Sequence, residues 1–239
     1  MRSLLILSAI SVPVRHVSNA TPRTRLIHLD FSDTAFSFTA GQAVMVGLRD
    51  SPLRKPYSIA SAPWELEKTG VLQLLAQIDD TGSLDPHLEL ATPGTLIDLE
   101  GPFGTFGLPP EFDAVPLLFV AGGTGIAPLR SILMERLSRP RVPAIAVVYS
   151  ARSPEEFAYR PELDAMAQAG RISLSLTVSR QDGVWGGRRG RIDRSLLKDA
   201  LPSIDACCLV CGPPQLVSDA TGLLAKLGVK PERILTERY

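Results

Sequence analysis

The first half of the chain alternates short apolar runs with turn residues. The runs that predict strands cover residues 25–31, 36–48, 56–62, 71–79 and 95–104. Several short strands at such spacing are typical of an antiparallel barrel or sandwich. We therefore expect the N-terminal half to be an all-β domain.

The apolar segment at residues 4–17 permits two interpretations. Together with Met1 and Arg2 before it, the segment imitates the charged start and apolar middle of a secretory signal peptide, with Ala20 as the cleavage position. Pro13, Arg15 and His16, however, interrupt the region where a processing site should be small and neutral. Because the segment is also rich in Ile, Leu and Val, we expect it to form the first strand.

After Pro109 and Pro110 the rhythm changes, and apolar runs alternate with stretches of helical character. This alternation is typical of βαβ units around a parallel sheet, so we place a domain boundary near Glu111. The predicted strands cover residues 116–123, 144–151, 172–179, 207–214 and 232–239, and the predicted helices cover residues 127–138, 154–170, 195–202 and 214–228.

Charge and length exclude several classes of protein. The 25 basic and 25 acidic residues balance, so no overall field favours nucleic acid or an anionic membrane surface. No apolar stretch approaches the about 20 residues that span a bilayer, so we expect neither a nucleic-acid partner nor membrane insertion.

All three cysteines lie in one apolar segment, at Cys207, Cys208 and Cys211. Three cysteines are too few for a disulfide framework, which points to the reducing cytoplasm. Cys208 and Cys211 have C-x-x-C spacing, but a structural zinc needs about four ligands and no second cluster of Cys or His exists. We expect core cysteines and no metal, with Cys211 facing a cleft because it precedes Gly212.

Two segments have the composition of ligand-binding turns. Gly122, Gly123 and Gly125 follow an apolar strand and open an amphipathic helix, where backbone amides can bind a pyrophosphate. A tight strand-to-helix connection is the alternative. In SPLRKPYSIASAP, two cations precede an aromatic residue and hydroxyl groups, which suits a phosphate and a stacked ring. A proline-led strand with a solvated basic turn is the alternative there.

Taken in order, the segments KPYSIAS, TGSL, GPFG, GGTGIAP, CGPP and a terminal ERY resemble the ferredoxin–NADP reductase superfamily over nearly the whole chain. The resemblance implies a two-domain β plus α/β fold. A Greek-key, flavin-binding antiparallel β-barrel is expected at residues 1–111, and a doubly wound, NAD(P)-binding parallel sheet at residues 112–239. FAD is expected as the cofactor rather than FMN.

On the flavin side, Tyr57 resembles the aromatic residue that stacks on the flavin ring, and Ser58 resembles the hydroxyl near the hydride-accepting nitrogen. The family usually has Arg-x-Tyr-Ser here, whereas Lys55 takes the arginine position and Arg54 precedes it. Lysine is a point charge rather than a bidentate fork, which leaves the pyrophosphate contact open. The residues expected to bind the flavin are Arg54, Lys55, Pro56, Tyr57, Ser58, Ile59, Gly82, Ser83 and Leu84.

On the nucleotide side, the glycine turn resembles the pyrophosphate loop, and CGPP resembles the turn beside the nicotinamide. The terminal Tyr239 resembles the tyrosine that covers the flavin face and moves for hydride transfer, with Glu237 as its companion. An ordinary edge strand with a frayed tail is the alternative. The expected catalytic residues are Ser58, Cys211, Glu237 and Tyr239, and the expected nucleotide-binding residues are Gly122, Gly123, Thr124, Gly125, Pro128, Cys211, Gly212, Pro213 and Tyr239.

Several cations are candidates for the extra phosphate of NADPH. Ser179 with Arg180, and Arg188 with Arg189 after Trp185, are placed to clamp it through charge-assisted bonds, and Arg152 is a candidate on the adenosine side. The alternative is a solvated basic loop in an enzyme that uses NADH. We expect NADPH rather than NADH.

The resemblance implies hydride transfer from NAD(P)H to FAD, followed by electron release to a protein acceptor. The C-x4-C-x2-C spacing of a plant-type ferredoxin is absent from the sequence, so a separate ferredoxin, flavodoxin or oxygenase component is expected as the partner. We expect the protein itself to be a monomer or a weak dimer. The alternatives are a flavin or quinone reductase, an electron-transfer subunit of a larger complex, and a binding module that has lost the flavin.

Overall fold

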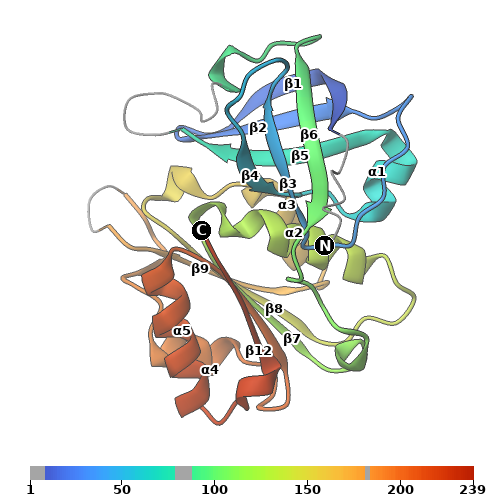
Figure 1. Cartoon of the computed structure of the whole chain (residues 1–239). Helices are drawn as coiled ribbons and strands as arrows, with labels where there is room; N and C mark the ends of the chain where they lie inside the picture. The colour runs from blue at the N-terminus through green and yellow to red at the C-terminus, as the bar shows by residue number, and fades with distance from the viewer. Residues whose placement is uncertain (1–8, 79–87, 181–183) are drawn as a thin grey trace, which may run out of the picture.

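The computed structural model describes residues 9–78, 88–180 and 184–239. Two six-stranded sheets lie one above the other, the N-terminal sheet on top in Figure 1. The connection between them runs from the end of the last N-terminal strand, Phe103, to the first strand of the second sheet, Leu117. The boundary that we predicted near Glu111 falls in this connection.

The first sheet is antiparallel throughout, with strand order β4-β3-β6-β1-β2-β5. A bridge between Ile59 and Leu74 joins its two edges and closes the barrel. Alternate side chains of β1 and β2, such as Val12, Val14 and Ile27, point into the barrel core. The strands are β1 (Ile10–Thr21), β2 (Thr24–Asp30), β3 (Ala43–Leu48), β4 (Lys55–Ser58), β5 (Val71–Gln77) and β6 (Leu96–Phe103). The predicted antiparallel barrel is confirmed.

Three local predictions for this domain need correction. The first strand begins at Ile10 and extends to Thr21, and residues 1–8 lie outside the described part of the chain. Within residues 36–48 only β3 is a strand, because Gly41 turns the chain with a φ of 97°. A short helix, α1 (Pro63–Thr69), was not predicted. Its signals are a proline in the first turn and Glu65, whose carboxylate accepts the Ala62 N–H at 2.7 Å.

The second sheet is parallel, with strand order β10-β9-β8-β7-β11-β12. Its first strand lies in the middle, so the chain builds outward to one side through β8 and then to the other through β11. The strands are β7 (Leu117–Gly122), β8 (Ile145–Ala151), β9 (Ser173–Val178), β10 (Arg188–Arg189), β11 (Cys207–Gly212) and β12 (Ile234–Arg238). The predicted doubly wound domain is confirmed.

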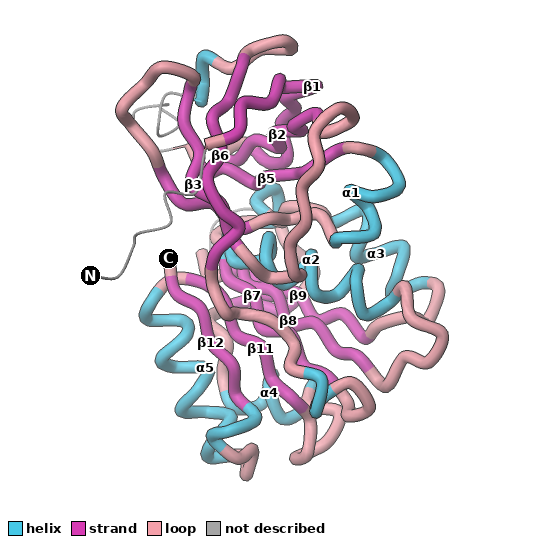
Figure 2. Tube along the Cα trace, turned by 45° about the vertical axis from the view of Figure 1, so that its right-hand side comes forward, coloured by secondary structure: helices cyan, strands magenta, loops and turns pink. Residues whose placement is uncertain are grey.

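Helices cover both faces of the parallel sheet (Figure 2). Phe119 and Leu209 pack on one face against α2 and α3, and Leu118 and Val210 pack on the other against α4 and α5. Because both faces are covered, the central strands are apolar without alternation. The helices are α2 (Ile126–Leu137), α3 (Arg160–Gln168), α4 (Arg194–Ala200) and α5 (Pro214–Lys226).

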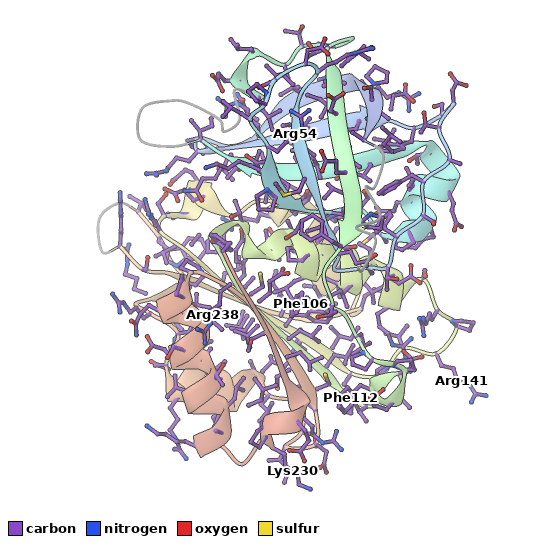
Figure 3. The ribbon with its side chains drawn as sticks, viewed as in Figure 1. Arg54, Phe106, Phe112, Arg141, Lys230 and Arg238 are labelled. Carbon is purple, nitrogen blue, oxygen red and sulfur yellow. The ribbon has the colours of Figure 1, made fainter. Side chains whose placement is uncertain are left out.

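The two domains share an apolar core. Leu75 and Ala60 of the barrel belong to the same buried cluster as Phe119 and Leu129 of the second domain. Phe106, which is labelled in Figure 3, lies in the connection between the domains, is 8% exposed and belongs to that cluster. Burial of apolar surface on both sides fixes the domains against each other. In the described part of the chain, no helix is long and apolar enough to cross a membrane.

Candidate functional site

The carboxyl ends of β7 and β11 lie side by side where the chain direction around the sheet reverses, with Cys211 beside Ala121. A Cβ on Gly125 would lie 2.3 Å from the Cys211 carbonyl oxygen, and one on Gly122 would lie 2.4 Å from the Leu216 side chain. At Gly125 only glycine permits this approach, because the neighbouring atoms belong to the backbone of Cys211 and Gly212. Open α/β sheets bind ligands at such a switch point, and the N-terminus of α2 adds a positive end.

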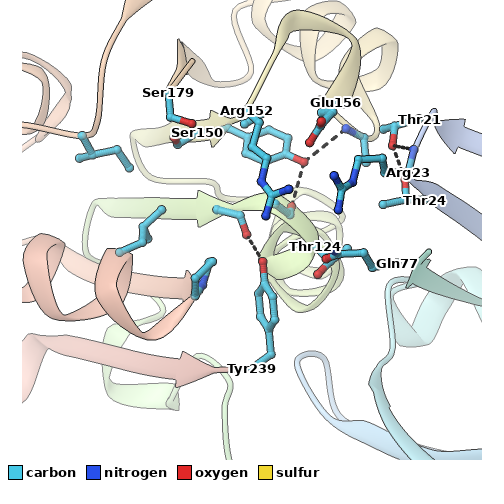
Figure 4. A pocket seen from close by; sticks show the side chains of 18 of the residues that line it. Thr21, Arg23, Thr24, Gln77, Thr124, Ser150, Arg152, Glu156, Ser179 and Tyr239 are labelled. Carbon is cyan, nitrogen blue, oxygen red and sulfur yellow. Dashed lines mark hydrogen bonds between the residues drawn. The ribbon is translucent and has the colours of Figure 1, made fainter. Parts of the chain in front are cut away.

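A cavity of about 360 Å³ opens at this point (Figure 4). It extends from the glycine turn to the ends of β8 and β9 and to the first turns of α5, and its other wall is the barrel. The second domain contributes to the lining, among others, Gly122, Gly123, Thr124, Ser150, Arg152, Ser179, Arg191, Pro213, Gln215, Leu216 and Tyr239.

This cavity brings together some of the residues predicted to bind nucleotide and leaves others out. Gly122, Gly123, Thr124, Arg152, Ser179, Pro213 and Tyr239 line it, whereas Gly125, Pro128, Arg180, Arg189, Cys211 and Gly212 do not. Gly125 instead packs against β11, and Pro128 is buried in the first turn of α2.

Sequence reasoning missed two arginines of the cavity, Arg23 and Arg191. The basic run after Trp185 was the correct region for the second of them. Arg188 in that run binds Asp193, with Nη2 2.6 Å from Oδ2, so it is engaged locally. Arg23 gave no signal, because it lies almost a hundred residues before the glycine turn in the sequence.

Three of the four residues predicted to be catalytic meet at the junction of the domains. The Cys211 thiol lies 3.8 Å from Glu237 Oε2 and donates to it, and the Ser58 hydroxyl donates to the same carboxylate. Ser58 ends β4 of the barrel, whereas the other two lie on neighbouring strands, β11 and β12, in direct register. The junction therefore combines groups from both domains.

Burial controls the protonation of this cluster. It raises the pKa of the Glu237 carboxyl above its ordinary value, although hydrogen bonds from Cys211 and Ser58 act in the opposite direction. Burial, reinforced by the nearby Glu237 charge, also raises the pKa of the Cys211 thiol. The thiol is therefore a neutral hydrogen-bond donor at neutral pH rather than a nucleophilic thiolate.

Tyr239 lies against the glycine turn formed by Gly122, Gly123 and Gly125. Its hydroxyl donates to the Gly122 carbonyl oxygen at 2.7 Å (Figure 4). The pairing of β12 with β11 places Arg238 beside Gly212, so the next residue reaches the end of β7. The side chain is 53% exposed and occupies part of the nucleotide cavity. That it covers a flavin ring stays a prediction.

Arg54 does not fit the predicted contact with the flavin phosphates. Its Nη2 lies 2.8 Å from Asp98 Oδ2, and its Nη1 donates to the carbonyl oxygens of Leu48, Ser51 and Leu53. A largely buried cation is retained by the carboxylate and carbonyls that surround it. Arg54 therefore fixes the loop before β4 within the barrel.

The other residues predicted on the flavin side form one stretch of the barrel. Lys55 and Pro56 are exposed at the start of β4, Tyr57 and Ser58 are half-buried, and Ile59 is buried in the closing bridge. A cation, an aromatic ring and a hydroxyl thus follow one another along β4, and the hydroxyl, that of Ser58, contacts Glu237. This donor set fits a flavin with its phosphate chain. Gly82, Ser83 and Leu84 lie outside the described residues.

Comparison with known proteins agrees with this arrangement. Residues 11–107 match the oxidoreductase FAD-binding domain and residues 119–221 match the oxidoreductase NAD-binding domain. Over 243 aligned residues the chain is 32% identical to ferredoxin–NADP reductase B of Sorangium cellulosum (strain So ce56), with 95% of each protein covered. It is 29% identical to NADH-cytochrome b5 reductase 1 of Eremothecium gossypii, covering 72% of this chain and 62% of that relative.

Solved structures share the fold. A ferredoxin NADP+ reductase from Neisseria gonorrhoeae, with bound FAD and NADP, superimposes with a TM-score of 0.80 at 23% identity, covering 96% of this chain and 98% of the other. The Amycolatopsis cytochrome P450 reductase GcoB gives a TM-score of 0.84 at 24% identity, covering 97% and 69%. The chain belongs to the ferredoxin–NADP reductase family and is an NAD(P)H-dependent, FAD-binding flavoprotein reductase.

Proposed function

We propose that this reductase oxidises NADPH and passes the electrons to a separate small redox protein, a ferredoxin or a flavodoxin. The observation that carries the proposal is the cluster of Ser58, Cys211 and Glu237, which joins the barrel to the nucleotide domain at the switch point of the parallel sheet. The choice of acceptor is supported by the similarity to the Sorangium cellulosum ferredoxin–NADP reductase B over 95% of each protein.

The side chains of the cluster and of β4 beside it have distinct tasks in this proposal. Bound FAD would supply the hydride acceptor that no side chain can provide. Tyr57 would pack on one face of the flavin ring, and Lys55 would neutralise its phosphates. Ser58 would present its hydroxyl to the ring, oriented by the bond to Glu237. The buried Cys211, on the nucleotide side, would position the nicotinamide and exclude water from it.

The preference for NADPH rests on the cations at the nucleotide end of the cavity. Ser179 directly follows β9, and Arg152 and Arg191 line the same cavity. An arginine fork and a hydroxyl are suitable donors for the extra phosphate of NADPH. We infer that Arg191 takes the role first given to Arg180 and Arg189, neither of which lines the cavity.

A panel of acceptors tests the proposal. The FAD-loaded protein is mixed with NADPH or NADH and with a ferredoxin, a flavodoxin, a cytochrome b5 or the quinone menadione, and reduction of each acceptor is followed by absorbance. We expect fast reduction of ferredoxin and flavodoxin with NADPH. Reduction confined to cytochrome b5 or menadione, with the two redox proteins inert, would show that the acceptor has been wrongly assigned.

A matched variant tests the coenzyme assignment. Arg191→Gln should raise the KM for NADPH by about tenfold, the effect of losing one charge-assisted hydrogen bond, and leave that for NADH unchanged. Arg180→Gln is the control, because Arg180 does not line the cavity. Equal effects of the two variants would contradict the assignment.

A further inference from the structure

One wall of the nucleotide cavity belongs to the barrel. Its residues come from the hairpin between β1 and β2 and from the adjacent strand β5, and they are Thr21, Arg23, Thr24, Leu75 and Gln77. Figure 4 shows the Arg23 side chain entering the cavity next to that of Arg152, which comes from the end of β8. An arginine from each domain therefore reaches the same space.

The backbone of Arg23 is held on both sides. The Thr21 and Thr24 hydroxyls are buried and bonded to each other at 2.8 Å, which closes the hairpin turn. The Arg23 N–H donates to the Thr21 hydroxyl oxygen at 3.2 Å, and the Arg23 carbonyl accepts the Ile78 N–H at 2.8 Å. These bonds fix the backbone of the turn, so only the Arg23 side chain has to be ordered when a ligand binds.

The charge of the lining suits a polyanion. Its positively charged side chains are Arg23, Arg152 and Arg191 and its negatively charged side chains are Glu156 and Asp219, so the side chains sum to three minus two, or one net positive charge. In Figure 4, Arg152 lies between Ser179 and Arg23, with Thr124 of the glycine turn below. Arg23 is thus placed at the end of the cavity near the glycine turn, away from Ser179.

We propose that Arg23 is a nucleotide-binding residue contributed by the barrel, which binds the pyrophosphate of the nicotinamide dinucleotide across the domain junction. This inference rests on the proposed use of NAD(P)H and deepens it. The bound nucleotide contacts both domains through its phosphates, with the glycine turn on one side and the hairpin on the other. Because both coenzymes have the pyrophosphate, Arg23 contributes equally to the binding of NADPH and NADH.

The test measures binding of NADP+ and NAD+ to the FAD-loaded protein by titration calorimetry. Arg23→Gln should weaken both by about tenfold, since one charge-assisted bond is lost, and Arg23→Lys should recover part of the affinity. Arg25→Gln is the matched control: it removes the same charge from the same hairpin, but Arg25 does not line the cavity. In steady state, Arg23→Gln should raise KM and leave kcat within about twofold, as expected for uniform binding.

The outcomes separate this inference from the function on which it rests. Unchanged binding in Arg23→Gln, or a loss confined to NADP+, would overturn the pyrophosphate contact while wild-type reduction by NADPH still upheld the function. Wild-type protein that binds neither nucleotide would overturn both. A thermal melt of Arg23→Gln that matches that of Arg25→Gln would confirm that the folded state is unchanged.

Discussion

Arg130 of α2 and Glu65 of α1 form a buried ion pair across the domain junction, with Nη1 2.9 Å from Oε2. The same guanidinium binds Glu162 at 2.7 Å and donates to the Ala60 carbonyl oxygen at 2.8 Å. One cation therefore joins the barrel to two helices of the nucleotide domain. Ser58 and Arg23 lie on the barrel side of this junction, so the ion pair contributes to the geometry of the site.

Replacing Arg130 should destabilise the protein strongly. Arg130→Met leaves the Glu65 and Glu162 carboxylates without their cation, and the loss of one partner of a buried pair costs about 3–5 kcal/mol. Arg139→Met is the control, because the pair of Arg139 with Asp113 is about 40% exposed and should contribute less than about 1 kcal/mol. Urea unfolding measures the free energy of unfolding of both variants. Equal losses would show that the buried pair has no special role. The double variant Arg130→Met/Glu65→Gln should recover part of the loss.

His28 should make the protein less stable in mild acid. Burial, the facing His16 and the more distant Arg130 charge lower its pKa below 6.5. Its ring lies 5.7 Å from that of His16, and Nδ1 has no hydrogen-bond partner among the described residues. Above pH 6.5 both folded and unfolded chains hold a neutral His28. As the pH falls, the unfolded chain takes up the proton first, so stability decreases until the folded pKa is passed.

The variant His28→Gln removes that titration. Urea unfolding between pH 5 and 8 should therefore show a smaller loss of stability on acidification for His28→Gln than for wild type. Parallel curves for the two proteins would show that His28 titrates alike in both states.

Glu237 should act in the opposite direction. Its raised folded pKa means that its contribution to stability is present below the ordinary value of 4.5 and is lost as the pH rises through the folded pKa. Glu237→Gln keeps an acceptor for Ser58 and Cys211 but cannot ionise. The variant should thus gain stability relative to wild type between acid and neutral pH. A constant difference across this range, measured by urea unfolding, would contradict the shift.

Removing Tyr239 from the nucleotide turn should strengthen nucleotide binding. Its hydroxyl bond to the Gly122 carbonyl must break if the ring leaves the cavity. Tyr239→Phe removes that bond, worth about 1 kcal/mol, so NADP+ should bind up to about fivefold tighter. Tyr239→Ser removes the ring as well and should bind more tightly still. Titration of the FAD-loaded variants that gave weaker binding would show that Tyr239 supports the nucleotide instead of blocking it.

The pattern of apolar and polar residues predicted both sheets because the side chains that it marks as apolar are the ones buried in each domain. The central parallel strand β7 is apolar throughout because helices cover both faces, and β1 alternates because only one face enters the barrel core. The short helix α1 was missed, since seven residues give too little periodicity and its cap is formed by the Glu65 side chain.

Prediction of the site failed where a contact joins residues that lie far apart in the sequence. Ser58, Cys211 and Glu237 were each expected to be catalytic from the resemblance, but their contact with one another was not predicted and appears only in the structure. The pairing of Arg54 with Asp98 was not predicted, because Asp98 lies 44 residues away in the sequence and reaches Arg54 only once the barrel forms. Arg23 was not predicted at all, because its part in the cavity depends on how two separately predicted domains pack together.

The most direct test of the central claim is anaerobic mixing of the FAD-loaded protein with NADPH, following the flavin absorbance in a stopped-flow instrument. Wild type should bleach rapidly, and Ser58→Ala should bleach at least tenfold more slowly while its nucleotide affinity stays near that of wild type. Failure of both NADPH and NADH to bleach the wild-type flavin would contradict hydride transfer at this site.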